Sequence, residues 1–226
     1  MQRYAIPDWV KQRILRRRPA LFAHQYIAAK KSALVVVDMQ NYFVAPGHLG
    51  ETPAAREIVA NINRLAAALR AAGGTVIWIQ TSSARALERW EKHHRHMLSE
   101  ERSAKRIAGL AEGSEGFKLY PELDARREDV YVRKTTYSAL IRDSSNLEAE
   151  IRSRGVESLL IAGTTTNVCC ESTARDAMLL DYRVVVLSDA TAAATLEEHV
   201  ASLNNLALFF ADVMTVDEAA ERLVKE

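Results

Sequence analysis

Apolar residues along the chain gather in short continuous runs that alternate with longer stretches of helical periodicity. A continuous, β-branched run is typical of a strand that is buried on both faces of a parallel sheet. The pattern predicts five such strands and a short sixth one, at residues 33–40, 75–80, 129–134, 158–163, 183–189 and 211–215.

Helices are predicted between most of these strands. In the stretch 56–72, aliphatic side chains recur on one helical stripe, and Gly73-Gly74 follows as a terminating pair. Further helices are expected at 146–155, at 195–210 and from Val216 onward. This order implies right-handed crossovers and a parallel sheet that helices cover on both faces. We therefore predict an α/β fold, a three-layer α/β/α sandwich with a mainly parallel, Rossmann-like sheet of about six strands.

Two segments interrupt this pattern. Residues 1–31 precede the first strand, and we expect this N-terminal arm to wrap the domain or a partner subunit. Residues 82–123 hold a charged helical stretch and then a glycine-rich turn, which we interpret as a lid or an oligomer contact. A chain of 226 residues suffices for one large domain and is short for two, so 32–226 is expected to form one domain.

The composition is that of an ordinary globular protein, with 48% apolar and 26% charged residues. The net charge of +1 provides no field that favours nucleic acid or a membrane surface. No apolar run approaches the roughly 20 residues that span a bilayer, and the basic start lacks the apolar core of a secretion signal. The two cysteines, Cys169 and Cys170, are adjacent and cannot staple distant parts of a fold. A cytoplasmic location is therefore expected.

Candidate chemistry lies where the predicted strands end, because ligands of parallel sheets bind beyond the carboxyl ends of the strands. The residues at those ends are Asp38, Gln80, Lys134, the turn 163–166 and Asp189. Cys169 begins the helix after the fourth strand. We therefore expect Asp38, Lys134 and Cys169 to converge at one edge of the sheet.

These three residue types suit attack on an amide-like carbonyl carbon. The pKa of a cysteine at a helix N-terminus should be lowered, and a nearby lysine should lower it further. A carboxylate can accept the thiol proton and later give it to a leaving amine. Backbone amides of the preceding turn can hold a developing oxyanion. Taken singly, Asp38 could be only a helix cap, Lys134 a surface residue and Cys169 an inert core residue.

Three blocks of the sequence carry a family resemblance. They read ALVVVDMQNYF, VRKTTYSAL and AGTTTNVCCESTARDAMLLDYRVVVLSDATAA, in that order. With them, residues 32–215 resemble the isochorismatase-like cysteine hydrolase superfamily. Short motifs such as DMQN, RSRG and TNVC make the chain similar to ureidoacrylate amidohydrolases, and next to biuret hydrolases and N-carbamoylsarcosine amidases.

The resemblance implies a catalytic set. Asp38 would be the general base and acid, Lys134 would stabilise charge near the thiolate, and Cys169 would be the nucleophile. It also implies a cis peptide bond between Thr164 and Thr165, with the amides of Thr165 and Cys169 directed at the oxyanion.

The neighbouring residues leave alternatives open. Cys170 stands where the family usually has valine, so we expect it to fill an apolar position, although reversed roles of the two cysteines stay open. The threonine run also fits a simple helix N-cap by Thr166 or Asn167, and both interpretations are compatible.

No metal site is expected. The Asp-x-His motif and further histidine that nicotinamidases of this superfamily carry after the first strand are absent. His48 is interpreted as a surface loop residue, and the cluster of His93, His94 and His96 lacks a helical i, i+4 pair. No glycine-rich dinucleotide motif follows the first strand, and no cofactor is expected.

The sequence therefore predicts a cysteine-dependent amidohydrolase that cleaves a C–N bond of a small linear amide or ureide through a thioester, releasing ammonia or an amine. The alternatives are a vinyl-ether hydrolase of the isochorismatase type, and a non-catalytic or redox protein with vicinal thiols on the same fold. The expected partner is a small-molecule substrate, without nucleic acid or membrane, in a homodimer or homotetramer. Substrate-binding candidates are Asn41, Phe43, Gln80 and Tyr137, and an arginine for a substrate carboxylate could be Arg85, Arg89 or Arg133.

Overall fold

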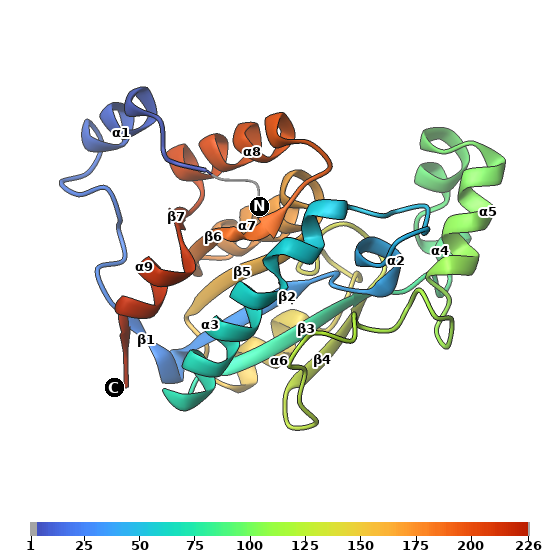
Figure 1. Cartoon of the computed structure of the whole chain (residues 1–226), viewed down its shortest axis with the longest axis horizontal. Coiled ribbons are helices and arrows are strands. Elements are labelled where there is room, and N and C mark those ends of the chain that lie inside the picture. Colours follow the sequence, from blue (N-terminus) through green and yellow to red (C-terminus); the bar gives the residue numbers. More distant parts are fainter. Residues whose placement is uncertain (1–3, 226) are drawn as a thin grey trace.

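The computed structural model describes residues 4–225, and its centre is a parallel sheet of six strands in the order β4-β3-β2-β5-β6-β7 (Figure 1). These strands are β2 Ser32–Val37, β3 Thr75–Thr81, β4 Val130–Lys134, β5 Ser158–Thr164, β6 Arg183–Ala192 and β7 Asp212–Met214. A separate parallel pair joins the two ends of the chain, β1 Ile27–Ala28 and β8 Leu223–Val224.

Helices follow most of the strands. The α-helices are α1 Asp8–Leu15, α2 Asn41–Val44, α3 Val59–Ala71, α4 Ala86–Arg89, α5 Glu100–Gly109, α6 Leu147–Ser153, α7 Glu171–Leu179, α8 Leu196–Phe209 and α9 Val216–Glu221. Short 3-10 turns are η1 Ala29–Lys31 and η2 Pro53–Ile58, and π-helical turns are η3 His93–Met97 and η4 Thr166–Cys170.

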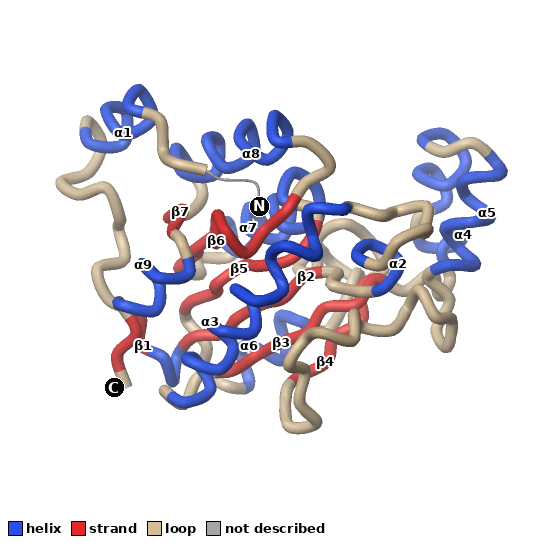
Figure 2. Tube along the Cα trace, in the orientation of Figure 1, coloured by secondary structure: helices blue, strands red, loops and turns tan. Residues whose placement is uncertain are grey.

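Figure 2 shows helices on both faces of the sheet, and the sheet separates two apolar layers. Leu34 and Val36 of β2 point to the layer of α3 and α9, whereas Val35 and Val37 point to the layer of α6, α7 and α8. Successive side chains of a strand leave on opposite faces, and here both faces are apolar. The predicted three-layer α/β/α sandwich with a parallel six-stranded sheet is confirmed.

Element ends differ from the predictions by a few residues. The first predicted strand ends at Val37 because Asp38 has a φ of 52°, which takes the backbone out of the extended conformation. The strand predicted at 183–189 continues to Ala192, after a register shift against β5. The short sixth strand is present as β7.

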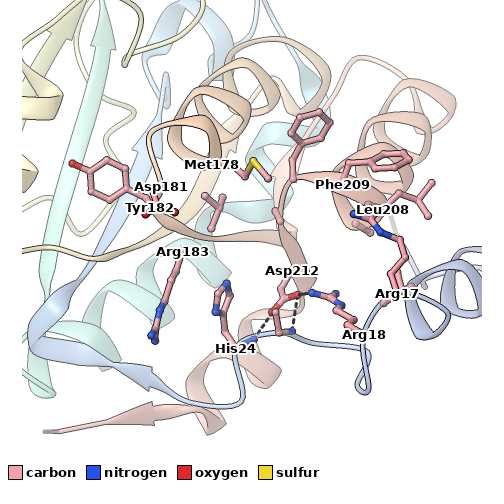
Figure 3. A pocket seen from close by; sticks show the side chains of 16 residues that line it. Arg17, Arg18, His24, Met178, Asp181, Tyr182, Arg183, Leu208, Phe209 and Asp212 are labelled. Carbon is pink, nitrogen blue, oxygen red and sulfur yellow. Dashed lines mark hydrogen bonds and ion pairs between the residues drawn. The ribbon is translucent and has the colours of Figure 1, made fainter.

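The N-terminal arm packs on its own domain. Val10 and Ile14 of α1 are buried in the layer that contains α8, and the Tyr4 hydroxyl donates to Asn204. Figure 3 shows Asp212, at the start of β7, between Arg18 and the chain near His24. These residues border an open pocket of about 440 Å³ at the amino-end edge of β6 and β7. Whether the arm also meets a partner subunit stays a prediction.

Residues 82–123 form α4, η3, α5 and a long loop. Figure 1 shows α5, in green, beyond the carboxyl ends of β2 and β3 and beside α2. The segment therefore lies at the edge of the sheet where the site was expected, and its role as a lid or oligomer contact stays a prediction. Within residues 4–225, no helix is both long and apolar enough to cross a bilayer.

Candidate active site

Four adjacent strands each place one side chain in a row at the carboxyl edge of the sheet. Because the strand order is β4-β3-β2-β5, Lys134, Thr81, Asp38 and Cys169 come from or directly after consecutive strands. All four side chains are buried. The structure thus brings together the three residues that the sequence selected, and adds Thr81 as a fourth.

Lys134 is the hub of this row. Its Nζ lies 2.8 Å from Asp38 Oδ2 and 3.5 Å from Cys169 Sγ, and it donates to Thr81 Oγ1 at 2.6 Å. A further hydrogen bond goes to the carbonyl of Thr136 at 3.0 Å. Burial on its own would lower the pKa of Lys134, but the charges of Asp38 and Cys169 and the hydrogen bond to Asp38 raise it overall. Lys134 is therefore a fixed ammonium, not a surface lysine.

Asp38 is held on both sides. Thr81 Oγ1 donates to Asp38 Oδ1 at 2.8 Å, while Oδ2 faces Lys134. The residue adopts a left-handed conformation, which aspartate tolerates better than most residues do. This conformation ends β2 and keeps the carboxylate inside the row, so Asp38 does not serve as a solvent-exposed helix cap.

The Cys169 thiol keeps its proton near pH 7 in the free protein, and its sulfur accepts a hydrogen bond from Lys134 Nζ. Burial raises its pKa to about 12, Lys134 lowers it in part, and the charge of Asp38 and a hydrogen bond to Asp38 raise it. The sequence-based expectation of a lowered thiol pKa is therefore wrong. The reason is that loss of hydration outweighs the effect of the nearby lysine when the residue is only 6% exposed.

The turn before Cys169 has the conformation that the family resemblance implied. The peptide bond between Thr164 and Thr165 is cis. Thr164 Oγ1 donates to the backbone carbonyl of Asp38 at 3.2 Å, which ties this turn to the end of β2. Thr166 Oγ1 lies 2.9 Å from His199 Nδ1, so the hydroxyl joins a buried pair with α8. The Thr165 and Cys169 amides thus belong to the same short turn, because η4 follows the cis peptide bond directly.

Cys170 has different surroundings from Cys169. Both cysteines are free thiols. Cys170 Sγ faces the carbonyl of Ala162 in β5 at 3.8 Å, and the side chain is fully buried among apolar residues. This environment agrees with the expected apolar filling role.

The predicted substrate-binding residues divide into two groups. The amide groups of Asn41 and Gln80 donate to the loop carbonyls of Glu115 and Phe117, at 3.1 and 2.9 Å. Phe43 is buried in the apolar layer of α3. These three side chains are therefore occupied by structural contacts, and substrate binding by them stays a prediction.

Tyr137 lies at the site itself. Its ring packs edge-to-face against Trp90 and His93, with centroids 4.6 and 5.4 Å away. The charges of Cys169 and Lys134 also affect the pKa of its hydroxyl. Burial raises the pKa of Tyr137. Tyr137, Trp90 and His93 thus form an aromatic wall beside the cysteine.

The histidine cluster joins this wall and was not predicted to do so. His93 stacks on Trp90 with centroids 3.9 Å apart, and buried His94 shares a 2.9 Å hydrogen bond with Ser103. Burial, with the positive charge of Arg106, lowers the pKa of His93 to about 4 and lowers that of His94. Both rings are therefore neutral near pH 7. In the described part of the chain, no three histidine, cysteine or carboxylate groups gather in a metal-binding arrangement.

The three arginines proposed for a substrate carboxylate face other groups. Arg85 pairs with Glu88 in an exposed contact, and Arg133 pairs with Glu112 at 2.7 Å while 63% exposed. Arg89 lies 4.0 Å from Asp143. None of these contacts is directed at Cys169. The arginine whose charge reaches the cysteine is Arg106 of α5, which the sequence did not single out.

Gln40 is a further residue that sequence reasoning missed. Its side chain accepts from the Thr81 amide at 2.7 Å and donates to the Thr81 carbonyl at 3.1 Å. The paired bonds fix the end of β3 beside β2, and so they set the position of the Thr81 hydroxyl. The sequence signal was its place two residues after Asp38, immediately before the expected loop.

Comparison with known proteins identifies the family. The isochorismatase domain model matches residues 32–218. Ureidoacrylate amidohydrolase RutB of Variovorax paradoxus strain S110 is 35% identical over 231 residues, covering 94% of this chain and 88% of that protein. A cysteine hydrolase structure from Pseudomonas syringae pv. phaseolicola 1448A has a TM-score of 0.75 and 30% identity, over 87% of this chain and 93% of that one.

A nicotinamidase structure, PncA from Bacillus subtilis, has a TM-score of 0.68 and 25% identity, over 81% of this chain and 99% of that one. The family match covers the whole sheet and every residue of the buried row. The chain therefore belongs to the isochorismatase domain family of hydrolases.

Proposed function

We propose that this protein is a cysteine-dependent amidohydrolase that cleaves a C–N bond of a small linear amide or ureide. It is a hydrolase of non-peptide C–N bonds in this proposal, and it releases ammonia or an amine. The observation that carries the proposal is the buried row in which the Cys169 thiol meets both the Asp38 carboxylate and the Lys134 ammonium.

The first stage forms a thioester. Asp38 accepts the thiol proton while Cys169 Sγ attacks the carbonyl carbon, so the thiolate is generated only as the new C–S bond forms. This order suits a thiol whose pKa is raised to about 12, because a free thiolate is scarce near pH 7. Lys134 stays charged throughout and lies 3.5 Å from the sulfur, where it stabilises the developing negative charge.

The tetrahedral intermediate then collapses. Its oxyanion accepts hydrogen bonds from the backbone amides of Thr165 and Cys169, in the turn before α7. Protonated Asp38 gives its proton to the leaving nitrogen, the C–N bond breaks, and ammonia or an amine departs. Cys169 remains as the acyl thioester.

The second stage uses the same groups in reverse. Asp38, ionised again, takes a proton from water as the water oxygen attacks the thioester carbonyl. The C–S bond breaks, the acid product leaves, and the Asp38 proton returns to Cys169. Thr81 keeps the carboxylate oriented in both stages through its 2.8 Å hydrogen bond.

Support for a linear amide or ureide comes from the relatives. The curated relative at 35% identity is named for ureidoacrylate, and the nicotinamidase is named for another amide. The aromatic wall of Trp90, His93 and Tyr137 suits a small planar group such as a ureide. The partners remain those expected from the sequence: a small-molecule substrate, no nucleic acid, no membrane, and a homodimer or homotetramer in the cytoplasm.

The alternatives are less well supported. A vinyl-ether hydrolase does not need a cysteine nucleophile, and it leaves the contact of Cys169 with Asp38 and Lys134 without a role. A redox pair of vicinal thiols would need the two sulfurs to react together, but Cys170 Sγ faces Ala162 and Cys169 Sγ faces Lys134.

The test is ammonia release from a panel of ureides and primary amides by the full chain. We expect turnover of at least one ureide, and its loss by more than about 1,000-fold in Cys169→Ala and Cys169→Ser, since the covalent route is removed. Cys170→Ala is the matched control and should keep most of the activity. Mass spectrometry of quenched turnover should find the acyl group on the Cys169 peptide.

Normal turnover in Cys169→Ala would remove the nucleophile from the proposal. Loss of turnover in Cys170→Ala alone, with an intact fold, would reverse the roles of the two cysteines. Fast reaction of two linked thiols with a disulfide reagent at neutral pH, with no amide turned over, would favour the redox alternative.

A further inference from the structure

Arg106 has an unusual place among the arginines of the 82–123 segment. It lies on α5 between Ser103 and Leu110, which are both buried, so its side chain leaves the helix on the covered face. It borders a small cavity of about 10 Å³ together with Thr81 and His94. Thr81 is the residue that links Asp38 to Lys134, so Arg106 stands next to the buried row.

Electrostatic interactions with α2 and with the buried row agree with this position. The charge of the guanidinium acts on the Tyr42 hydroxyl, and also on Cys169, Lys134 and Tyr137. Tyr42 belongs to α2, and its ring packs against Gly109 of α5. Arg106 thus lies where α5 meets α2, next to Thr81 of the buried row.

The charge of Arg106 is not balanced within the protein. Two neighbouring cations have carboxylate partners, since Lys105 pairs with Glu101 and Arg133 pairs with Glu112. Across residues 4–225, no carboxylate lies within ion-pair distance of Arg106. The nearby Lys134 charge is matched by Asp38, so the site holds one positive charge in excess. A half-buried guanidinium with no anion is a ready partner for a carboxylate.

We propose that Arg106 is a specificity-determining residue that binds a carboxylate of the substrate, so that the site acts on a monoanionic ureide or amide. This inference rests on the proposed function of the same site. The carboxylate lies against Arg106 while the ureide carbonyl faces Cys169, with the aromatic wall between α4 and β4 beside it. Because the cavity beside Arg106 holds only about one water molecule, the proposal requires α4 and α5 to move outward when the substrate binds.

The test compares one acid with its uncharged ester. Ammonia release is measured for 3-ureidoacrylate and for methyl 3-ureidoacrylate. We expect Arg106→Gln to lower kcat/KM for the acid by about 100-fold, mainly through KM, because a charge-assisted hydrogen bond is lost. The same variant should change kcat/KM for the ester by less than about 3-fold. Arg106→Lys keeps the charge but loses the planar fork, and should fall between the two.

The matched control is Arg102→Gln, one turn earlier on the same face of α5 but with an exposed side chain, which should leave both substrates unaffected. Equal losses for acid and ester in Arg106→Gln would overturn the inference and leave the proposed function intact. A binding experiment tests the carboxylate site without turnover. Calorimetry measures the affinities of acrylate and 3-ureidoacrylate for Cys169→Ala and for the Cys169→Ala, Arg106→Gln double variant. Equal affinities in the two proteins would also overturn it.

If the wild-type chain turns over neither compound but binds the acid only when Arg106 is present, the proposed function fails and the carboxylate site stands. The two failures are therefore separate. An arginine that only holds α5 to α2 through Tyr42 would affect acid and ester alike.

Discussion

At the scale of single residues, the raised pKa of the Cys169 thiol should make the free energy of unfolding depend on pH. The ordinary thiol pKa is 9.0, and burial raises the pKa of Cys169 to about 12 in the folded protein. Below pH 9 the thiol keeps its proton in both the folded and the unfolded chain. Between pH 9 and 12 the unfolded chain loses that proton while the folded chain keeps it, so the free energy of unfolding falls as pH rises.

The expected loss from pH 8 to pH 10 is about 1.4 kcal/mol, because one pKa unit corresponds to about 1.4 kcal/mol. Urea unfolding of wild type and Cys169→Ala at pH 8, 9 and 10 measures it, since the other titrating groups are common to both proteins. The wild-type curve should fall more steeply by this amount. Parallel curves would show that the thiol is not a raised-pKa group in the folded state.

Residue-scale prediction from the sequence succeeded where topology alone decides the position. Asp38, Lys134 and Cys169 follow adjacent strands, and parallel strands end at one edge, so their proximity follows from the strand order. The pKa of Cys169 could not be predicted, because the sequence identifies the neighbouring lysine but not the depth of burial. The two effects have opposite signs, and burial is the larger one.

At the scale of elements, a shift of one residue in the predicted end of a strand changes which side chain is expected to face the site. The sequence pattern predicted that the second strand ends at Gln80, whereas β3 ends at Thr81. Successive side chains leave a strand on opposite faces. Gln80 therefore turns to the loop at Phe117, and Thr81 bonds to Asp38 and Lys134.

The covering helix α5 was harder to predict. Its sequence is dominated by charges, and the spacing of Ser103 and Leu110 is the one sign of a buried face. Even with that face recognised, the docking of α5 beside α2 depends on long loops whose path has no periodic signal. Arg106 was therefore not predictable from its own neighbourhood.

Gly163 supports a prediction about how β5 meets β2. Its φ is +108°, and a Cβ there would lie 2.0 Å from the carbonyl oxygen of Val37, the residue before Asp38. Gly163→Ala should therefore lower the free energy of unfolding by more than about 2 kcal/mol, since both the backbone conformation and the strand contact are violated. Turnover should fall as well, because β2 must shift next to Asp38. Urea unfolding and ammonia release measure the two effects.

Gly155 provides the matched control for this substitution. Its φ is +64°, and a Cβ there would meet nothing within 4 Å. Gly155→Ala should cost only the conformational part, about 1 kcal/mol, with turnover unchanged. If the two variants were equally stable, close approach of β5 to β2 would not be a constraint on the site.

At the scale of the whole molecule, the carboxyl and amino ends of the strands hold different parts of the protein. The carboxyl edge holds the buried row, and the amino edge of β6 and β7 holds the N-terminal arm. Asp212 makes that second connection: its carboxylate accepts the amides of Ala23 and His24 at 3.0 and 2.8 Å and pairs with Arg18 at 2.8 Å. The side chain of Asp212 is fully buried, so its charge depends on these partners.

Asp212→Asn therefore tests whether the arm is a stabilising element that is independent of catalysis. Removing the buried charge should lower the free energy of unfolding by about 3 kcal/mol, because Arg18 and two backbone donors lose their anion. Amide hydrogen exchange should become faster in residues 8–28, where α1 and β1 are anchored. Turnover measured well below the unfolding temperature should stay within about 2-fold of wild type, since residues 8–28 lie away from the carboxyl edge that holds the buried row.

Asp8→Asn is the control for the same charge change on the exposed side of α1, where the pairing with Lys11 is open to solvent and should not affect stability measurably. A large loss of turnover in Asp212→Asn, with the sheet still protected from exchange, would mean that the arm acts on the site at a distance. Unchanged exchange in residues 8–28 would mean that apolar contacts of Val10 and Ile14 hold the arm without Asp212. The expected pattern, faster exchange in the arm with turnover intact, would establish that stability and chemistry are divided between the two edges of one sheet.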